Sequence, residues 1–510
     1  MGETETHIDV EQDEFIRPTF NRSIRVEARP ERLSADAGVL MMREVMERTG
    51  LIDWIDARFH DLRQSDQVTY SMPELLRTQL TLLAQGWTCA DDADRRREDP
   101  AFRLGVSDRR QDVPLRASSR PRTADGLASQ PTLSRLLAAA AEPGNLAVLK
   151  EANLRCAQQH CRWLDGRQRY ARITLDVDSL PVLVHGQQSG ALYNGYYHAT
   201  CYHPLILGSA DLGHIFGAIL RPGNAHTADG ALTDLREYLD WIETHLAWEV
   251  TVRGDAGFPA DDLLCLLEQR LRPASYVFRI RNYKPLQQLA QPYVQRYLQD
   301  LGQRPEQMRQ QGFRTHELGY QAKDWKQRRR VVLVIVPPEE EELLPRSFYL
   351  ITNFDTRAMP AAELLALYRQ RGTYEQQLGD FMHTLVPHLS STTRPKSHYR
   401  GQTPRQRQVA RDVFNTNQAM LSLNVLAHNL LNLGRCIAER AQTKPGRPKT
   451  HGRQSAAMSL RTFRQRYLKV PARVTLHSRR VWISIAPAAA VLWHNWWDYL
   501  QRLGSLPMTD

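Results

Sequence analysis

The sequence predicts an α/β protein with a mixed sheet, a helical region before this sheet and a β-rich insertion within it. Two observations carry the prediction. In residues 166–282, strand-like and helix-like segments follow in the order three strands, helix, strand, helix, strand. Three strands joined by short turns favour an antiparallel meander, whereas strands separated by helices favour parallel pairing. Residues 283–360 then add three strand-like runs around a hairpin.

Composition limits the class of protein. The chain has 510 residues with 67 Lys and Arg against 56 Asp and Glu, a net charge of +11, which favours a polyanionic partner. The 42% hydrophobic content indicates a folded protein, and six cysteines without a CxxC pair fit free thiols in a reducing compartment. The acidic N-terminus is unlike a signal peptide and the apolar runs are too short for a bilayer. We therefore expect a cytoplasmic protein with no membrane association.

The chain divides into six predicted regions. They are a disordered tail (1–20), a helical region (21–165), the first part of the sheet core (166–282), the β-rich insertion (283–360), the second part of the core (361–440) and a C-terminal basic region (441–510). The second part of the core holds a long amphipathic helix from about residue 412 to 441. A strand-like run and a Trp-rich helix close the sequence.

Helical patterning dominates the N-terminal region. Residues 34–61 predict two short helices, because Ser34 is a suitable N-cap and Gly50 interrupts the pattern. A further helix covers roughly 72–86.

The segment "SQPTLSRLL" starts another helix, with Pro131 favouring its first turn. Thr132, Ser134 and Arg135 then lie at a helix N-terminus, where backbone N–H groups favour a phosphate. An ordinary capped helix explains these residues equally well. Arg135 is the candidate phosphate-binding residue of this region.

Acidic residues stand at two strands of the predicted core. In "LDVDSL", Asp176 and Asp178 are two residues apart on the first strand and therefore point to one face. Carboxylates on an apolar strand are costly unless they bind something. In "TVRGDAGF", Asp255 ends the fourth strand, at the edge where open α/β sheets place ligands.

A third carboxylate lies on the predicted helix of residues 361–380. At 100° per residue, Tyr368, Arg371 and Glu375 share one stripe with the apolar Leu364 and Leu378. The pattern therefore predicts that this helix turns Glu375 toward the core. An Arg–Glu pair at this spacing is often only a solvated salt bridge, which is the alternative interpretation.

These carboxylates converge if the first and fourth strands are neighbours and the helix packs across their ends. Oxygen ligands without nearby cysteine favour magnesium or manganese over zinc. Two such ions about 4 Å apart activate water and stabilise the leaving oxygen in phosphodiester cleavage. Arg371 is placed to pair with Glu375 or to bind a phosphate.

At these residues the sequence resembles DDE-type transposases of bacterial insertion sequences, in the branch with a Tyr-x2-Arg-x3-Glu signature. The signature is Tyr368, Arg371 and Glu375. Further motifs of the resemblance are "LDVDSL", "HGQ" (185–187), "RPGNAH" (221–226), "RGDAGF" and "NTNQAMLSLNVLAHNLL". The resemblance extends from about residue 30 to about residue 475.

The resemblance implies an RNase H-like catalytic core of the retroviral integrase superfamily, an N-terminal helical DNA-binding region and the β-rich insertion. It implies that Asp178, Asp255 and Glu375 are catalytic and bind Mg²⁺, for which Mn²⁺ can substitute. Asp176 is the alternative for the first Asp and a candidate metal ligand; Ser179 favours Asp178 because the family usually has a small hydroxyl residue there. Hydrolysis frees a 3′-OH at the element end, which then attacks target DNA.

The implied partners are double-stranded DNA, as terminal inverted repeats and as target, and a second copy of the chain in a homodimer on paired ends. The implied location is the bacterial cytoplasm, associated with the nucleoid. One position departs from the branch, because Met382 stands where a Lys often follows the Glu. The phosphate contact is then either missing or supplied by Lys396 or Arg394.

Further DNA contacts are expected outside the carboxylates. Tyr368 and Arg371 are expected to contact the DNA backbone. Trp325 of the insertion has basic neighbours and is a candidate for stacking on a flipped base, with packing in its hairpin as the alternative. Arg447, in "KPGRPK" (444–449), is a candidate for minor-groove binding, with a basic linker as the alternative.

Two other functions fit the same residues. One is a catalytically inactive or repurposed transposase that acts as a DNA-binding protein. The other is an RNase H-like nuclease that cuts without joining. The presence of all three carboxylates favours the enzyme over the binding protein.

Overall fold

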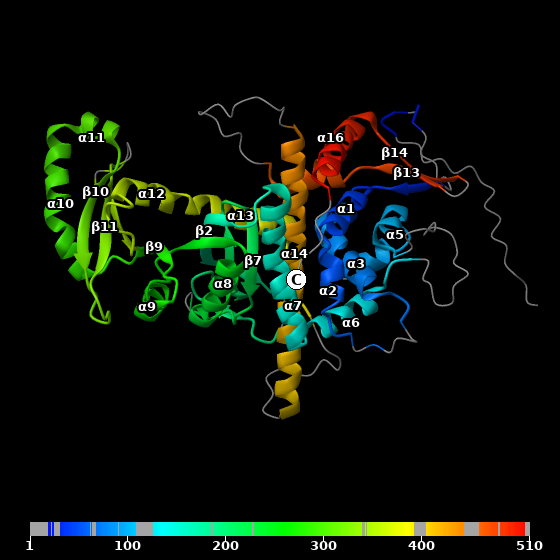
Figure 1. The fold of residues 1–510 in the computed structure, drawn as a ribbon, viewed down its shortest axis with the longest axis horizontal. Coiled ribbons are helices and arrows are strands. Elements are labelled where there is room, and N and C mark those ends of the chain that lie inside the picture. The colour runs from blue at the N-terminus through cyan, green and yellow to red at the C-terminus, as the bar shows by residue number, and fades with distance from the viewer. Residues whose placement is uncertain are drawn as a thin grey trace, which may run out of the picture.

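The long helix α14 (Pro404–Gln442) runs through the middle of the molecule, with a large sheet on one side and the N-terminal helices on the other (Figure 1). The structure is a computed structural model. It describes residues 19–504 apart from 22, 25–30, 62, 64–67, 90, 109–125, 185, 187, 227–228, 339–341, 343, 392–403, 443–457 and 478–479, and no side chains of 404–411. Within the described chain, no helix has the length and apolar character that crossing a membrane requires.

The central sheet has eight strands in the order β10-β11-β12-β9-β8-β2-β6-β7. Its middle part pairs β7, β6 and β2 antiparallel, and then β2, β8 and β9 parallel. The predicted meander is confirmed, and the first and fourth strands are neighbours, which was the condition for the carboxylates to converge. The arrangement is that of an RNase H-like core. The elements of this part are β2 (Tyr170–Ser179), β6 (Leu205–Ser209), β7 (His214–Ile219), α8 (Ala231–His245), β8 (Ala247–Gly254), α9 (Asp261–Gln269) and β9 (Ser275–Ile280).

A small second sheet interrupts the meander between β2 and β6. Its strands are β3 (Val182–Leu183), β4 (Leu192–Asn194) and β5 (Ala199–Tyr202), in the order β3-β5-β4. The sequence predicted a single strand as the second strand of the meander. In the structure this segment forms two strands, β5 in the small sheet and β6 in the central sheet. The small sheet begins three residues after β2 ends, so it lies at the same edge as the C-terminal end of β2.

The insertion differs from the expected β-rich unit in two respects. It begins with two helices, and its three strands extend the central sheet because β12 pairs antiparallel with β9. These elements lie at the far left of Figure 1. They are α10 (Lys284–Gln303), α11 (Pro305–Gln311), β10 (Arg314–Tyr320), β11 (Arg329–Val336) and β12 (Arg346–Thr352).

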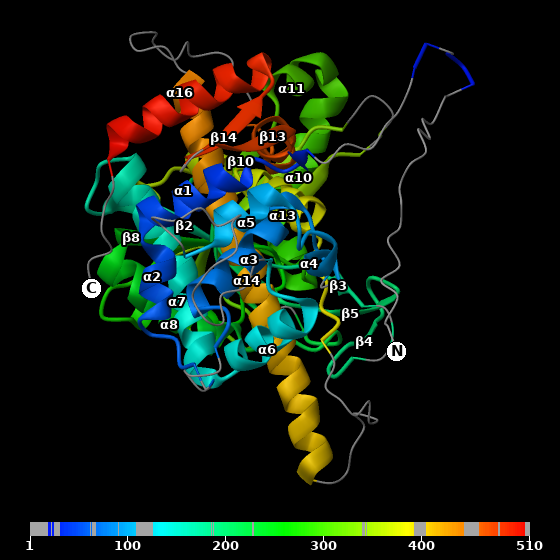
Figure 2. The ribbon, with the colours of Figure 1, turned by 90° about the vertical axis from the view of Figure 1, so that its right-hand side faces the viewer.

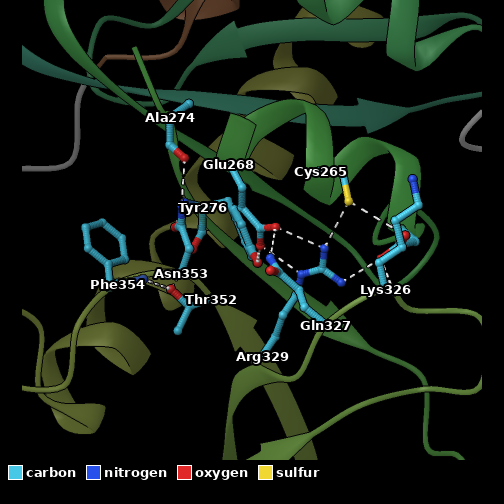
Figure 3. A network of polar contacts seen from close by, with 11 residues as sticks. Cys265, Glu268, Ala274, Tyr276, Lys326, Gln327, Arg329, Thr352, Asn353 and Phe354 are labelled. Carbon is cyan, nitrogen blue, oxygen red and sulfur yellow. Dashed lines mark hydrogen bonds and ion pairs between the residues drawn. The ribbon is translucent and has the colours of Figure 1, made fainter. Parts of the chain in front are cut away.

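A buried arginine attaches the insertion to the core. Arg329, 5% exposed, donates to Glu268 at 2.8 Å and to Asp261 at 2.8 Å, both on α9 (Figure 3). Tyr276 of β9 donates to the same Glu268 carboxylate at 2.7 Å. Burial acts to lower the pKa of Arg329, but its bonds to the two carboxylates raise it. The network therefore links β11, α9 and β9 through one charged group.

The N-terminal helices pack around α14, most of them on the side away from the sheet, whereas the last of them also packs against β7. They are α1 (Val39–Thr49), α2 (Leu51–Asp56), α3 (Met72–Gln85), α4 (Asp92–Arg95), α5 (Pro100–Val106), α6 (Gln130–Ala140) and α7 (Pro143–Gln159), which continues in a π-helical turn (His160–Leu164). The predicted break at Gly50 is confirmed, and its φ of 63° explains the glycine. Ser34 is not a cap; it ends a short strand and donates to Asp99 at 2.9 Å.

The two ends of the described chain meet in one sheet. Strand β1 (Arg32–Ser34) pairs with β13 (Ala472–His477), which pairs with β14 (Arg480–Ile485). The predicted C-terminal strands and Trp-rich helix, α16 (Pro487–Leu503), are present, with a short helix α15 (Leu460–Phe463) and a π-helical turn (Arg464–Leu468) before them. Figure 2 shows these red and orange elements beside the blue N-terminal helices.

Helix α14 protects the open edge of the sheet. It was expected to be amphipathic, yet it is buried all round from residue 419 to 434. Gln418 bonds to the backbone of Leu220 at 2.6 Å, and Asn429 bonds to both backbone groups of Ile215 at 2.7 and 3.0 Å. The two amides are three helical turns apart and face the edge strand β7. They satisfy backbone groups that an edge strand otherwise exposes.

Three buried histidines lie between α14, β7 and the end of α7. His160 Nδ1 is 3.0 Å from His214 Nε2, and His214 Nδ1 is 3.2 Å from Asn429 Oδ1. His428 Nε2 is 3.2 Å from the Gly213 carbonyl. Burial lowers the pKa of His160 and of His428 to about 4 and that of His214 well below its ordinary value.

We expect these histidines to make the fold sensitive to acid. Between pH 6.5 and 4 the unfolded chain binds more protons than the folded one, so the free energy of unfolding falls as the pH falls. One such histidine contributes a loss of about 1.5 kcal/mol between pH 6.5 and 5. Urea unfolding at these two pH values should show a smaller loss for His428→Gln than for wild type. The exposed His494→Gln is the control, and an equal loss in His428→Gln and wild type would contradict the prediction.

Candidate active site

Asp178 and Asp255 stand side by side at the ends of two parallel strands. The last pair in register between β2 and β8 is Val177 with Gly254, so each Asp is the next residue on its strand. Neighbouring strands are about 4.8 Å apart. Asp178 Oδ1 accepts from the Ser179 N–H at 2.9 Å and Asp255 Oδ1 from the Gly257 N–H at 2.8 Å. Each carboxylate is therefore fixed by one oxygen at the same edge of the sheet.

The expectation that Glu375 is turned into the core is wrong. Its side chain is 52% exposed, and Tyr374 is the buried residue of this turn, at 1%. The segment forms two helices, α12 (Ala361–Arg369) and α13 (Arg371–Leu385), instead of one. On α13 the buried positions are Tyr374, Leu378 and Phe381, which leaves Glu375 outside the buried stripe. Glu375 instead lies one turn along α13 from Arg371, on its accessible face.

Arg371 joins the carboxylates of two different elements. Its Nη2 is 2.6 Å from Asp178 Oδ2, and its Nη1 pairs with Glu375. Burial raises the pKa of Asp178 to about 6, with Arg371 opposing and the charges of Asp255 and Glu375 adding to the rise. Burial acts to lower the pKa of Arg371, but the carboxylates raise it. The three acids therefore share one electrostatic environment, in which a positive charge is strongly favoured.

The donor set fits a divalent cation. Asp178, Asp255 and Glu375 offer only carboxylate oxygens, the ligands that Mg²⁺ and Mn²⁺ prefer. The Arg371 guanidinium demonstrates that the space between Asp178 and Glu375 accepts positive charge. Within the described part of the chain, no three acidic, His or Cys side chains are already grouped as metal ligands. Binding of a metal here therefore requires the Arg371 side chain to move.

Asp176 lies in the core and is not available as a metal ligand. It is 1% exposed and accepts two hydrogen bonds from the Arg253 guanidinium, at 2.6 and 2.9 Å. Its Oδ2 also accepts from the Ala210 N–H at 3.1 Å. The expectation that Asp176 is a metal ligand is therefore corrected. The pleat directs Asp176 to the same face as Asp178. Asp176 lies two residues further inside the strand, where Arg253 neutralises its charge.

The Asp176–Arg253 pair also positions the two helices of the signature. Arg253 Nη1 donates to the Leu367 carbonyl near the end of α12 at 2.5 Å. Gln377 of α13 donates to the carbonyl of Ala210, whose N–H binds Asp176. Both sides of the α12–α13 junction are thus tied to one buried ion pair. Sequence reasoning missed Arg253, although it directly precedes the Gly-Asp of "RGDAGF".

The motif "RPGNAH" supports the strand end that carries Asp178. Arg221, 5% exposed, donates to the Ser179 hydroxyl at 2.8 Å and to the His203 carbonyl at 2.9 Å. Burial lowers the pKa of Arg221 to about 10. In "HGQ", His185 and Gln187 lie outside the described residues. The described motif residue Arg221 therefore fixes the residue next to Asp178.

Among the expected DNA-binding residues that the structure describes, Tyr368 lies near Arg371, whereas Arg135 and Trp325 lie on other elements. Tyr368 is half-buried, with its ring centroid 6.4 Å from that of Phe348 and its hydroxyl in the electrostatic environment of Arg371. Arg135 is exposed on α6. The first N–H of α6, at Gln130, is bonded to the Asp94 carboxylate at 3.1 Å. One N–H group at this helix N-terminus is therefore already bound by an acidic side chain.

Trp325 packs inside its hairpin. It is 8% exposed, with its ring 5.5 Å from that of Tyr320 and the Arg329 guanidinium 5.3 Å from its centroid. The structure favours the packing interpretation, since no open face is left for a base. Lys396, Arg394 and Arg447 lie outside the described residues. Met382 is partly buried against the helical core.

Comparisons with known proteins place the chain in a family. No curated protein matches it. Among solved structures, the piggyBac transposase in a synaptic complex with hairpin DNA is similar at 12% identity and a TM-score of 0.38, over 85% of this chain and 79% of that one. The family model "Transposase DDE domain group 1" matches residues 16–397, well over half of the chain. The chain therefore belongs to the DDE-domain transposase family.

Proposed function

We propose that this protein is a metal-dependent DNA transposase of the DDE type, in which Asp178, Asp255 and Glu375 hold two divalent ions, Mg²⁺ or Mn²⁺. The observation that carries the proposal is the arrangement of carboxylates. Two lie on adjacent parallel strand ends, and Arg371 connects one of them to the third. Phosphodiester chemistry with two divalent ions needs such a cluster of carboxylates.

The proposed reaction has two phosphoryl transfers. Water first attacks a phosphodiester at the element end, and the 3′ oxygen leaves and takes up a proton. The new 3′-OH then attacks a phosphodiester of target DNA, whose own 3′ oxygen leaves. When bound, the ions would activate the attacking oxygen and stabilise the leaving one.

The side chains have separate tasks in this proposal. Asp178 and Asp255 each have one oxygen fixed by a backbone N–H, so the other oxygen is directed to the open edge. Glu375 approaches from the accessible face of α13. Arg371, once released from Asp178, is placed to hold a phosphate of the DNA strand, for which a guanidinium is well suited.

The proposed partners are the terminal inverted repeats and target DNA, with a homodimer on paired ends. The net charge of +11 supports a polyanionic partner. A DNA-binding protein without catalysis is the second candidate. The observation in its favour is that Arg371 already neutralises Asp178 and Glu375.

A cleavage assay separates the two candidates. The full chain is incubated with a labelled duplex carrying the inverted repeat that flanks its gene, with Mg²⁺, with Mn²⁺ or with chelator. The enzyme should cut at the repeat boundary only with metal, leave a 3′-OH, and join the cut end to a supercoiled plasmid. Specific binding without cutting under all three conditions would contradict the proposal and support the binding protein. Cutting without joining would support a nuclease.

A further inference from the structure

We propose that the hairpin β4–β5 presents Tyr196, supported by Tyr197, as a stacking platform for an unpaired base of the DNA end beside the reacting phosphate. The proposal rests on the proposed function and names a contact for the same site. It assigns base stacking to the small sheet that follows Asp178, and not to Trp325 of the insertion.

The first observation is exposed aromatic surface. Tyr196 is 84% exposed and Tyr193 61% exposed, and Leu183 and Leu192 of the same small sheet are 57% and 43% exposed. Tyr197 is half-buried and lies edge to face with Tyr196, with ring centroids 4.9 Å apart. The two rings are nearly perpendicular, so the half-buried Tyr197 supports the Tyr196 ring by its side and leaves the face of the Tyr196 ring open. Such a surface suits a nucleobase, because every base offers a π-face.

The second observation is that the hairpin is held rigidly. Asn194 Oδ1 accepts from the N–H groups of Tyr196 at 3.0 Å and Tyr197 at 3.3 Å. The Asn194 amide donates to the Gly223 carbonyl at 2.7 Å. His198 has a φ of 51°, a left-handed conformation that costs energy for a residue with a Cβ and persists only where its surroundings enforce it. The backbone that carries the two tyrosines is therefore held by its own hydrogen bonds, which lowers the entropic cost of binding.

The third observation is a continuous path from the platform to the candidate catalytic carboxylates. The Tyr197 ring centroid is 5.7 Å from that of buried His203. The His203 carbonyl accepts from Arg221, which donates to the Ser179 hydroxyl, next to Asp178. Burial raises the pKa of Tyr197, and the charges of Asp178 and Asp255 raise it further. The platform therefore stands at the edge where the scissile phosphate would lie.

An unpaired base is the occupant that fits this place. Opening the end of a duplex costs unstacking and unpairing energy, and this cost is least where a base is already unpaired. A stacking residue next to the cleavage position recovers that cost. A second copy of the chain is the other occupant that exposed tyrosines suit, and it is an outcome of the test.

The test compares affinity for two duplexes carrying the repeat end, one fully paired and one with the terminal base unpaired. It is run without divalent metal, so that the DNA stays intact. Tyr196→Ala should bind the unpaired duplex about tenfold more weakly than wild type, while Tyr196→Phe keeps wild-type affinity because the ring is retained. Trp482→Ala, which removes an aromatic residue 56% exposed on β14, is the matched control and should bind as wild type does.

Each other result has a definite meaning. Equal affinity of Tyr196→Ala and wild type for the unpaired duplex would overturn the platform. An unchanged DNA affinity with altered sedimentation of Tyr196→Ala would overturn it in favour of a protein interface. Wild type that cleaves the repeat with metal while Tyr196→Ala binds normally would overturn the platform alone. Wild type that neither binds nor cleaves the repeat would overturn the platform together with the proposed function.

Discussion

Replacing Asp255 by Asn is expected to reduce strand cleavage by at least about 10³-fold, which corresponds to about 4 kcal/mol of transition-state stabilisation. The amide keeps the hydrogen bond that Asp255 Oδ1 accepts from the Gly257 N–H, so the turn after β8 should stay intact. It removes the negative charge that a divalent ion needs beside Asp178. Cleavage of the repeat duplex in Mg²⁺ measures the loss, and filter binding of the same duplex checks that DNA is still bound.

Asp262→Asn is the matched control for this experiment. Asp262 is also acidic, exposed and bonded through Oδ1 to a backbone N–H, that of Leu263 at 2.8 Å. It lies on α9, seven residues further along the chain, and takes no part in the proposed site. It should cleave as wild type does. An equal reduction in both variants, or none in Asp255→Asn, would show that Asp255 does not bind a catalytic ion.

Replacing Arg253 by Met should destabilise the fold by about 3–5 kcal/mol, because it leaves the Asp176 carboxylate buried without its partner. It also removes the donor to the Leu367 carbonyl and so loosens α12 from the strands. Urea unfolding at pH 7.5 measures the loss. The double variant with Asp176→Leu should recover much of it, since an apolar pair can replace a buried ion pair.

A surface pair on the same two strands provides the control. Arg172 of β2 and Glu249 of β8 form an ion pair at 2.7 Å, with side chains 57% and 64% exposed. Arg172→Met should cost less than about 1 kcal/mol, as exposed ion pairs do. Equal losses for Arg253→Met and Arg172→Met would show that the buried pair does not hold the core together.

Much of the fold follows from patterns along the chain. The strand and helix order predicted the antiparallel meander and parallel pairing in the later strand–helix–strand part, because short turns and helical crossovers leave few alternatives. The sequence left it as a condition that β2 and β8 are neighbours, and the structure supplies this pairing. This pairing alone brought Asp178 and Asp255 together. The central helix was predicted by its apolar periodicity, but its burial on all sides was not. In the sequence, Gln418 and Asn429 suggest a solvent-exposed polar face. In the structure, both side chains bind backbone groups at the edge strand β7.

The parts that escaped prediction depend on tertiary contacts. Helix α10 was missed because Pro292 lies inside it and glutamines break its apolar pattern, both of which argue against a helix. No proline marks the break between α12 and α13, so the sequence predicted one continuous helix. The direction of the Glu375 side chain was also predicted wrongly, because Tyr374 takes the buried position of that turn. The Asp176–Arg253 pair joins residues 77 positions apart. No local pattern indicates which of two neighbouring aspartates will find such a partner.

The central claim is that Asp178, Asp255 and Glu375 hold divalent metal, and Mn²⁺ binding tests it most directly. Mn²⁺ is titrated into the full chain bound to the repeat duplex, and free Mn²⁺ is measured by electron paramagnetic resonance. Wild type and Asp498→Asn, an exposed acid on α16, should bind Mn²⁺ with equal affinity and number. Asp178→Asn and Glu375→Gln should each bind fewer ions. Unchanged binding in both of these variants would contradict the assignment of the metal site.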